Sequence, residues 1–253
     1  MKKAFIIGLL AIAMISCAEL MSVANTAVGT LGSTGVTEQE NVAGLKSALN
    51  LGIESAVQTL GVQDGFFNDA ILKILLPSEA QAIVNNIKLI PGGSQLVDKA
   101  VLSMNRAAED AVKEAAPIFK NAILSMSITD GVGILFGGNN AATEYLKKTT
   151  YTQLQNAFAS KIRTSLNKPL VYNTSTSKTW NTLTSTYNSV ANNPIGAAAG
   201  LKTVNVDLEQ YVTGKALDAL FVKIADQEKS IRQNPTERVS TLLQRVFGQL
   251  DNK

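Results

Sequence analysis

The segment EQENVAGLKSALNLGIESAVQTLG, residues 38–61, decides the fold class of this chain. Its apolar residues recur at steps of three and four, which is the period of an amphipathic α-helix. The repeating positions are Val42, Leu45, Leu49, Ile53, Ala56 and Leu60. Gly61 follows the last of them and suits a helix C-cap. The segment is therefore predicted to form a helix with one buried face.

The same helical period continues towards the end of the chain, and no segment alternates as a β-strand does. Predicted helix starts carry capping residues at Ser78, Thr150, Asp207 and in NPTE, residues 234–237. Asn140 is expected to begin a short helix that ends before the one at Thr150. We predict an all-α protein in which residues 38–253 form one domain of roughly eight to ten helices.

Residues 173–205 differ from the rest of this domain because they are rich in Ser, Thr and Asn. They also contain GAAAG at residues 196–200. Trp180, Leu183 and Tyr187 share a helical spacing and predict a helix inside this insert. Its two flanks are predicted to be loops.

The N-terminal residues indicate export and lipid attachment. Lys2 and Lys3 precede an apolar run at residues 4–15, which is shorter than the ~20 residues of a membrane-spanning helix. MISC, residues 14–17, then resembles a bacterial lipobox, with Met14 where leucine is usual. We expect a lipoprotein signal peptide at residues 1–16, with Cys17 as the lipidated residue. An ordinary signal peptide, with Cys17 incidental, is the alternative.

The residues after Cys17 predict where the protein lies. Ala18 follows the cysteine, so the aspartate that retains many lipoproteins at the inner membrane is missing. Residues 17–37 are small and polar, without apolar periodicity, and are expected to form a flexible tether. The expected location is the bacterial cell envelope, anchored by lipid in the outer membrane and facing the periplasm.

Composition excludes several classes of function. The chain has 23 basic and 20 acidic residues, and removal of Lys2 and Lys3 leaves 21 against 20, which gives no electrostatic case for nucleic acid. Histidine is absent and Cys17 is the only cysteine. Histidine-based nucleophile systems and zinc or haem sites built on His or Cys are therefore excluded. Calcium or magnesium sites built from oxygen ligands remain possible, but no residue is assigned to one, and we predict no metal or cofactor. Chemistry based on carboxylates or lysine stays open.

The candidate ligand-binding residues are Asn105, Arg106 and Glu109. Arg106 and Glu109 are three residues apart and share a helix face, where arginine can bind a carboxylate or phosphate. Lys215 and Asp218 repeat this spacing later in the chain. The alternative interpretation of each pair is an ion pair that fixes the position of a helix.

A further group of charges, at residues 226–232, is predicted to be a solvent-exposed helix face. It consists of Asp226, Glu228, Lys229 and Arg232.

Several motifs together resemble the bacterial domain of unknown function 4197 family, over residues 42–248. They are GLKSAL at 44–49, DGFF at 64–67, ILLP at 74–77, NRAAE at 105–109, AATEYL at 141–146, KALDALF at 215–221 and IRQNP at 231–235. The resemblance implies an exported helical protein and carries no known activity. Residues 173–203 depart from the family pattern, in which a shorter segment is expected.

These observations lead to two hypotheses about function. The first is a non-enzymatic envelope lipoprotein whose helical domain binds an envelope protein or a small apolar or anionic ligand. The second is a histidine-independent hydrolase that uses carboxylates or lysine on cell-wall or glycan substrates. The second requires two acidic side chains that face each other across a cleft.

Overall fold

The computed structural model describes residues 35–90 and 92–251. Its regular elements are all helices, which confirms the predicted all-α class. The predicted signal peptide, Cys17 and the tether up to residue 34 lie outside the described residues. Within the described part, no helix is long and apolar enough to cross a bilayer.

Four long helices account for most of the domain: α2 (Glu38–Leu60), α4 (Gly93–Val112), α7 (Ala141–Asn167) and α10 (Leu208–Gln233). Two of intermediate length are α5 (Ala115–Ser125) and α8 (Thr176–Ala191). The short helices are α3 (Gln81–Asn85), α6 (Gly131–Leu135), α9 (Pro194–Ala198) and α11 (Thr241–Phe247). Single 3-10 turns occur at η1 (Ser78–Ala80), η2 (Ile87–Leu89), η3 (Pro235–Glu237) and η4 (Gly248–Leu250).

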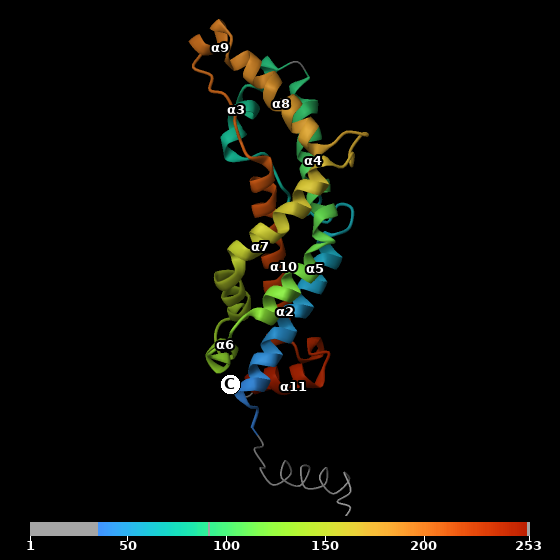
Figure 1. Ribbon diagram of the computed structural model, residues 1–253, viewed down its shortest axis with the longest axis vertical. Helices are drawn as coiled ribbons and strands as arrows, with labels where there is room; N and C mark the ends of the chain where they lie inside the picture. Colours follow the sequence, from blue (N-terminus) through green and yellow to red (C-terminus); the bar gives the residue numbers. More distant parts are fainter. Residues whose placement is uncertain (1–34, 91, 252–253) are drawn as a thin grey trace, which may run out of the picture. The chain divides into compact units, whose positions relative to one another are not determined.

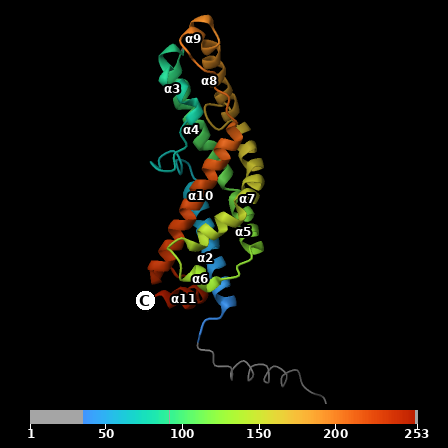
Figure 2. The same cartoon turned by 90° about the vertical axis from the view of Figure 1, so that its left-hand side faces the viewer.

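Helices α2 and α10 pack along each other, and the remaining long helices surround them. Helix α7 covers α10, whereas α5 and α11 cover α2 (Figure 1). Figures 1 and 2 place α6 and α11 at the end where α2 begins, and α8 and α9 at the opposite end. The predicted stripe of α2 faces this core, with Leu45, Leu49, Ile53, Ala56 and Leu60 fully buried.

Two glycines allow α2 to approach its neighbours closely. A Cβ atom at Gly52 would lie 2.9 Å from the Ile224 side chain and 3.2 Å from the Ile224 Cα atom on α10. A Cβ atom at Gly44 would lie 2.7 Å from the Val246 side chain on α11. Because packed cores resist added volume, a larger residue at either position would push the helices apart.

Two predicted helix starts are wrong, and at a third, Ser78 begins the 3-10 turn η1 without capping it. Helix α7 runs unbroken through Thr150, whose hydroxyl donates to the Leu146 carbonyl one turn earlier, so this residue is satisfied inside the helix. Asn234 caps only the 3-10 turn η3, and α11 begins after Ser240, whose hydroxyl accepts from the Leu243 N–H. The predicted start at Asp207 is confirmed, because its carboxylate accepts from the Gln210 N–H.

The insert is more helical than its composition predicts. Helix α8 contains the predicted residues Trp180, Leu183 and Tyr187, all buried, and packs on α4. The predicted loop after it contains the short helix α9, which begins at Pro194 with Asn193 as its N-cap. An extended segment at residues 201–207 then leads into α10.

The expected solvent-exposed face at residues 226–232 is also wrong for two of its charges. Glu228 is 0% exposed and Arg232 is 5% exposed. They pair with each other at 2.7 Å. The Glu228 carboxylate accepts the Ala142 and Thr143 N–H groups at the start of α7. Arg232 donates to the carbonyls of Ile134 and Leu135 at the end of α6.

This buried pair satisfies opposite ends of two helices. A carboxylate is favourable at a helix N-terminus and a guanidinium at a C-terminus, because of the partial charges there. Glu228 and Arg232 therefore hold the connection between α6 and α7 against α10. A helical periodicity gives no indication of such partners, because they come from residues about 90 positions away.

Arg238 holds the last turn of α10 in a related way. Its guanidinium donates to the carbonyls of Ile231 and Arg232, and it binds both oxygens of Asp251 at 2.6 and 2.7 Å. This hydrogen bond from Arg238 lowers the pKa of Asp251, against a smaller effect of burial. The C-terminal segment is thereby fastened to α10.

We predict that Glu228→Gln destabilises the domain by about 3–5 kcal/mol, because it leaves the Arg232 guanidinium buried without a counter-charge. Urea unfolding measures this change. Asp226→Asn, at an exposed position on the same helix, is the matched control and should change stability by less than about 0.5 kcal/mol. Equal stability of both variants would contradict the assigned role of the pair.

Candidate functional site

The structure brings Asn105, Arg106 and Glu109 of α4 together against the loop that follows α2. Arg106 binds Asp64 and Glu109 at 2.7 Å each. The other oxygen of Glu109 accepts the N–H groups of Phe66 and Phe67. Burial, the largest single effect, lowers the pKa of Arg106, but the hydrogen bonds that its guanidinium donates to Asp64 and Glu109 outweigh burial, and the pKa is raised. Both terminal nitrogens of the guanidinium are therefore bonded to carboxylates within the protein.

Asn105 fixes the same loop at a second point. Its side-chain oxygen accepts the Ile74 N–H at 2.9 Å, and its amide nitrogen donates to the Ile74 carbonyl at 2.8 Å. Asn105 is fully buried and Glu109 is almost so. In this structure the three residues hold residues 64–74 in place, which corresponds to the alternative interpretation of the motif. Their role towards a ligand stays a prediction.

Lys215 and Asp218 do not form the pair that their spacing suggests. Asp218 binds Lys147 of α7 at 3.2 Å. Lys215 lies near the ring of Tyr211, at 5.8 Å from its centroid, and faces a groove beside residues 71–78. Lys215 and Asp218 therefore do not bond to each other, and neither is bonded to the Arg106 cluster.

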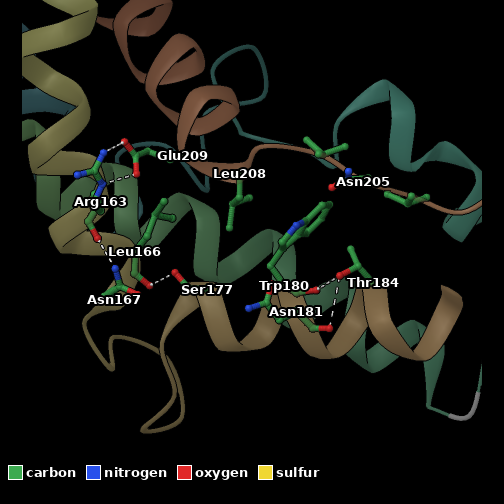
Figure 3. Close-up of a pocket in the computed structure, with 12 residues that line it drawn as sticks. Arg163, Leu166, Asn167, Ser177, Trp180, Asn181, Thr184, Asn205, Leu208 and Glu209 are labelled. Atoms are coloured by element: carbon green, nitrogen blue, oxygen red, sulfur yellow. Dashed lines mark hydrogen bonds and ion pairs between the residues drawn. The ribbon is translucent and has the colours of Figure 1, made fainter. Parts of the chain in front are cut away.

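A cavity of about 310 Å³ lies between the end of α7, α8 and the beginning of α10 (Figure 3). Its apolar wall consists of Leu166, Trp180, Val204, Val206 and Leu208. Its polar lining consists of Arg163, Asn167, Ser177, Asn181, Thr184, Asn205 and Glu209. The volume lies at the lower end of the range for pockets that hold small ligands.

Trp180 offers this cavity a hydrogen-bond donor. Its indole is 5% exposed and extends from α8 into the space between Leu208 and Asn205 (Figure 3). Its N–H forms no hydrogen bond with another described residue and is not one of the fully buried polar atoms that lack a partner, so it is accessible from the cavity. The side chains of Asn181 and Asn205 are also free of hydrogen bonds to described residues. These groups can bind carbonyl or hydroxyl oxygens of a ligand.

The charges that line the cavity neutralise each other. Arg163 of α7 binds both carboxylate oxygens of Glu209 on α10, at 2.6 and 2.8 Å (Figure 3). This hydrogen bonding with Glu209 raises the pKa of Arg163. The cavity therefore carries no net charge, which favours a neutral ligand.

Asn188 fixes the wall of the cavity that comes from the extended segment. Its side-chain amide donates to the Val204 carbonyl at 2.9 Å and accepts the Val204 N–H at 2.8 Å. Asn105 binds the backbone of Ile74 through the same two hydrogen bonds. Asn188 thus holds an otherwise unpaired stretch of backbone in a defined position.

The cavity was not predicted from the sequence. Its residues come from three separate segments, and four of the twelve are Asn, Ser or Thr of the insert at residues 173–205, whose flanks were predicted to be loops. The one available signal was Trp180, the only tryptophan in the chain, at a helical spacing within a polar segment.

One family model matches most of this chain. The model described as "Protein of unknown function (DUF4197)" matches residues 35–248. The chain belongs to this family. The match confirms the resemblance seen in the sequence motifs, and its range includes both the Arg106 cluster and the cavity. No curated protein and no solved structure matches the chain.

The site does not offer the acid pair that a carboxylate-based hydrolase needs. Glu209 is the one carboxylate among the residues that line the cavity, and Arg163 occupies both of its oxygens. Among residues 35–90 and 92–251, no three acidic side chains gather closely enough to suggest a metal site.

A pH-dependent contact holds the loop next to the Arg106 cluster. Asp69 accepts the N–H groups of Ile71 and Leu72 and binds Lys223 at 3.3 Å. The hydrogen bonds from Ile71 and Leu72 lower the pKa of Asp69 below its ordinary value of 3.8. A lowered pKa in the folded state means that the contact stabilises the protein above the unfolded value and is lost as the pH falls.

We predict that hydrogen exchange of residues 71–72 speeds up as the pH falls from about 5 to about 2, after correction for the intrinsic rate. In Asp69→Asn this extra acid sensitivity should be absent, because the charge is missing at every pH. Asp226→Asn should keep the wild-type profile. An unchanged profile in Asp69→Asn would show that another group controls the loop.

Proposed function

We propose that this protein is a lipid-anchored, non-enzymatic binding protein of the bacterial envelope. The MISC sequence at residues 14–17 supports the anchor, and Ala18 supports the outer membrane. Several acyl chains on Cys17 would give stable attachment where a single chain would not. The helical domain then faces the periplasm and carries the ligand site.

The ligand that we propose is a short neutral glycan, bound in the cavity between α7, α8 and α10. The observation that carries this proposal is the buried Trp180 with a free indole N–H at a cavity of zero net charge. Asn181 and Asn205 add amide groups that can bind sugar hydroxyls and acetamido groups. The apolar wall suits the C–H faces of a sugar ring. This ligand class differs from the apolar or anionic ligand expected around Arg106.

We predict that Cys17→Ser moves the protein from the membrane fraction to the soluble fraction, because the acyl chains can no longer be attached. Fractionation of cell envelopes followed by immunoblotting measures this. The matched control is Ser16→Ala, which keeps a small residue before the cysteine and should leave the protein in the pellet. A Cys17→Ser protein that remains in the pellet would contradict the anchor.

The ligand is tested with the fluorescence of Trp180, which reports on the cavity alone because the chain has no other tryptophan. We expect N,N′-diacetylchitobiose to shift the emission of the full chain carrying Cys17→Ser in a saturable way. Asn181→Ala should weaken this binding by roughly tenfold, since one ligand hydrogen bond is lost. Asn192→Ala, exposed at the end of the same helix and outside the cavity lining, should bind like wild type. No saturable shift in the parent chain would contradict the glycan proposal.

A further inference from the structure

A second concave surface lies on α10, away from the residues that line the glycan cavity. It is a groove of about 410 Å³ between residues 71–78 and one face of α10. Its apolar part includes Ile71, Leu75 and Leu76, and its polar part includes Lys73, Tyr211 and Lys215. No residue is shared between the two linings.

Two apolar side chains of this groove are exposed to solvent, although the backbone of their segment is fixed by hydrogen bonds. Ile71 is 87% exposed and Leu75 is 59% exposed, although both belong to a segment with many fixed contacts. Asp69 accepts the Ile71 N–H, and Tyr211 donates its hydroxyl hydrogen to the Leu75 carbonyl at 2.9 Å. Neighbouring apolar side chains that are exposed on a hydrogen-bonded backbone indicate an interaction site.

The groove also presents two lysines without acidic partners. Lys73 lies over the Phe67 ring at 3.8 Å and Lys215 near the Tyr211 ring, and neither forms an ion pair with a described residue. By contrast, Lys223, nearby on α10, binds Asp69. Glu79, next to Ser78 of the lining, accepts a hydrogen bond from Ser78 and is not itself part of the lining. The lining is therefore apolar at Ile71 and Leu75 and positively charged at Lys73 and Lys215.

We propose that this groove binds a single-chain anionic amphiphile. Its hydrocarbon chain would cover Ile71 and Leu75, and its phosphate or carboxylate would lie between Lys73 and Lys215. The ammonium groups would donate charge-assisted hydrogen bonds to the anion. Burial of the exposed apolar side chains would supply the remaining affinity. The site is independent of the glycan cavity.

Calorimetric titration of the full chain carrying Cys17→Ser with octyl phosphate tests this proposal. We expect saturable binding of octyl phosphate, at least roughly tenfold tighter than that of octyltrimethylammonium or methyl phosphate, which lack the anion and the chain respectively. Equal binding of the cationic amphiphile would overturn the proposal. Binding to vesicles with anionic lipid, with none to octyl phosphate, would also overturn it in favour of a membrane-contact surface.

Matched variants locate the binding. Lys215→Gln should weaken octyl phosphate by roughly tenfold, and Ile71→Ser by a similar factor. Their controls are Lys229→Gln, exposed on the same helix, and Ile195→Ser, which is 82% exposed on α9. Both controls should bind like the parent. All four side chains are exposed or lack ion pairs, so the variants are expected to fold, and circular dichroism checks this. Unchanged binding in Lys215→Gln and Ile71→Ser would overturn the proposal.

Discussion

The buried pair of Glu228 and Arg232 is the interaction on which the arrangement of the domain depends. Two charges removed from water are favourable only when every hydrogen-bonding group finds a partner. Here the partners are the first N–H groups of α7 and the last carbonyls of α6. Helix α10 thereby fixes where α7 begins. Helices α7 and α10 carry Arg163 and Glu209, which line the cavity, near their other ends.

Two asparagine side chains fix backbone segments that are not helical. Asn105 binds both polar groups of Ile74, and Asn188 binds both polar groups of Val204. Each side-chain amide replaces the neighbouring strand that an extended segment would have in a sheet. One asparagine holds the wall of the groove and the other holds the wall of the cavity. An all-helical protein thus obtains two rigid concave surfaces without using a β-sheet.

Local pattern predicted the class of the fold and several of its elements, such as the stripe of α2 and the start of α10 at Asp207. It failed where a distant residue decides the outcome. Thr150 resembles an N-cap but lies inside α7, and Glu228 resembles a surface acid but caps another helix. The cluster at Arg106 was found because its residues lie on one helix face. The cavity around Trp180 was missed because three distant segments form it.

We propose that the helical domain carries a small neutral compound in the cavity beside Trp180. Native mass spectrometry of the protein, released gently from its own envelope, tests this most directly. We expect a bound saccharide of defined mass in the parent protein, and a bare chain for Trp180→Phe, which keeps an aromatic ring but loses the indole N–H. A bare parent protein, or an adduct retained equally by both proteins, would contradict it.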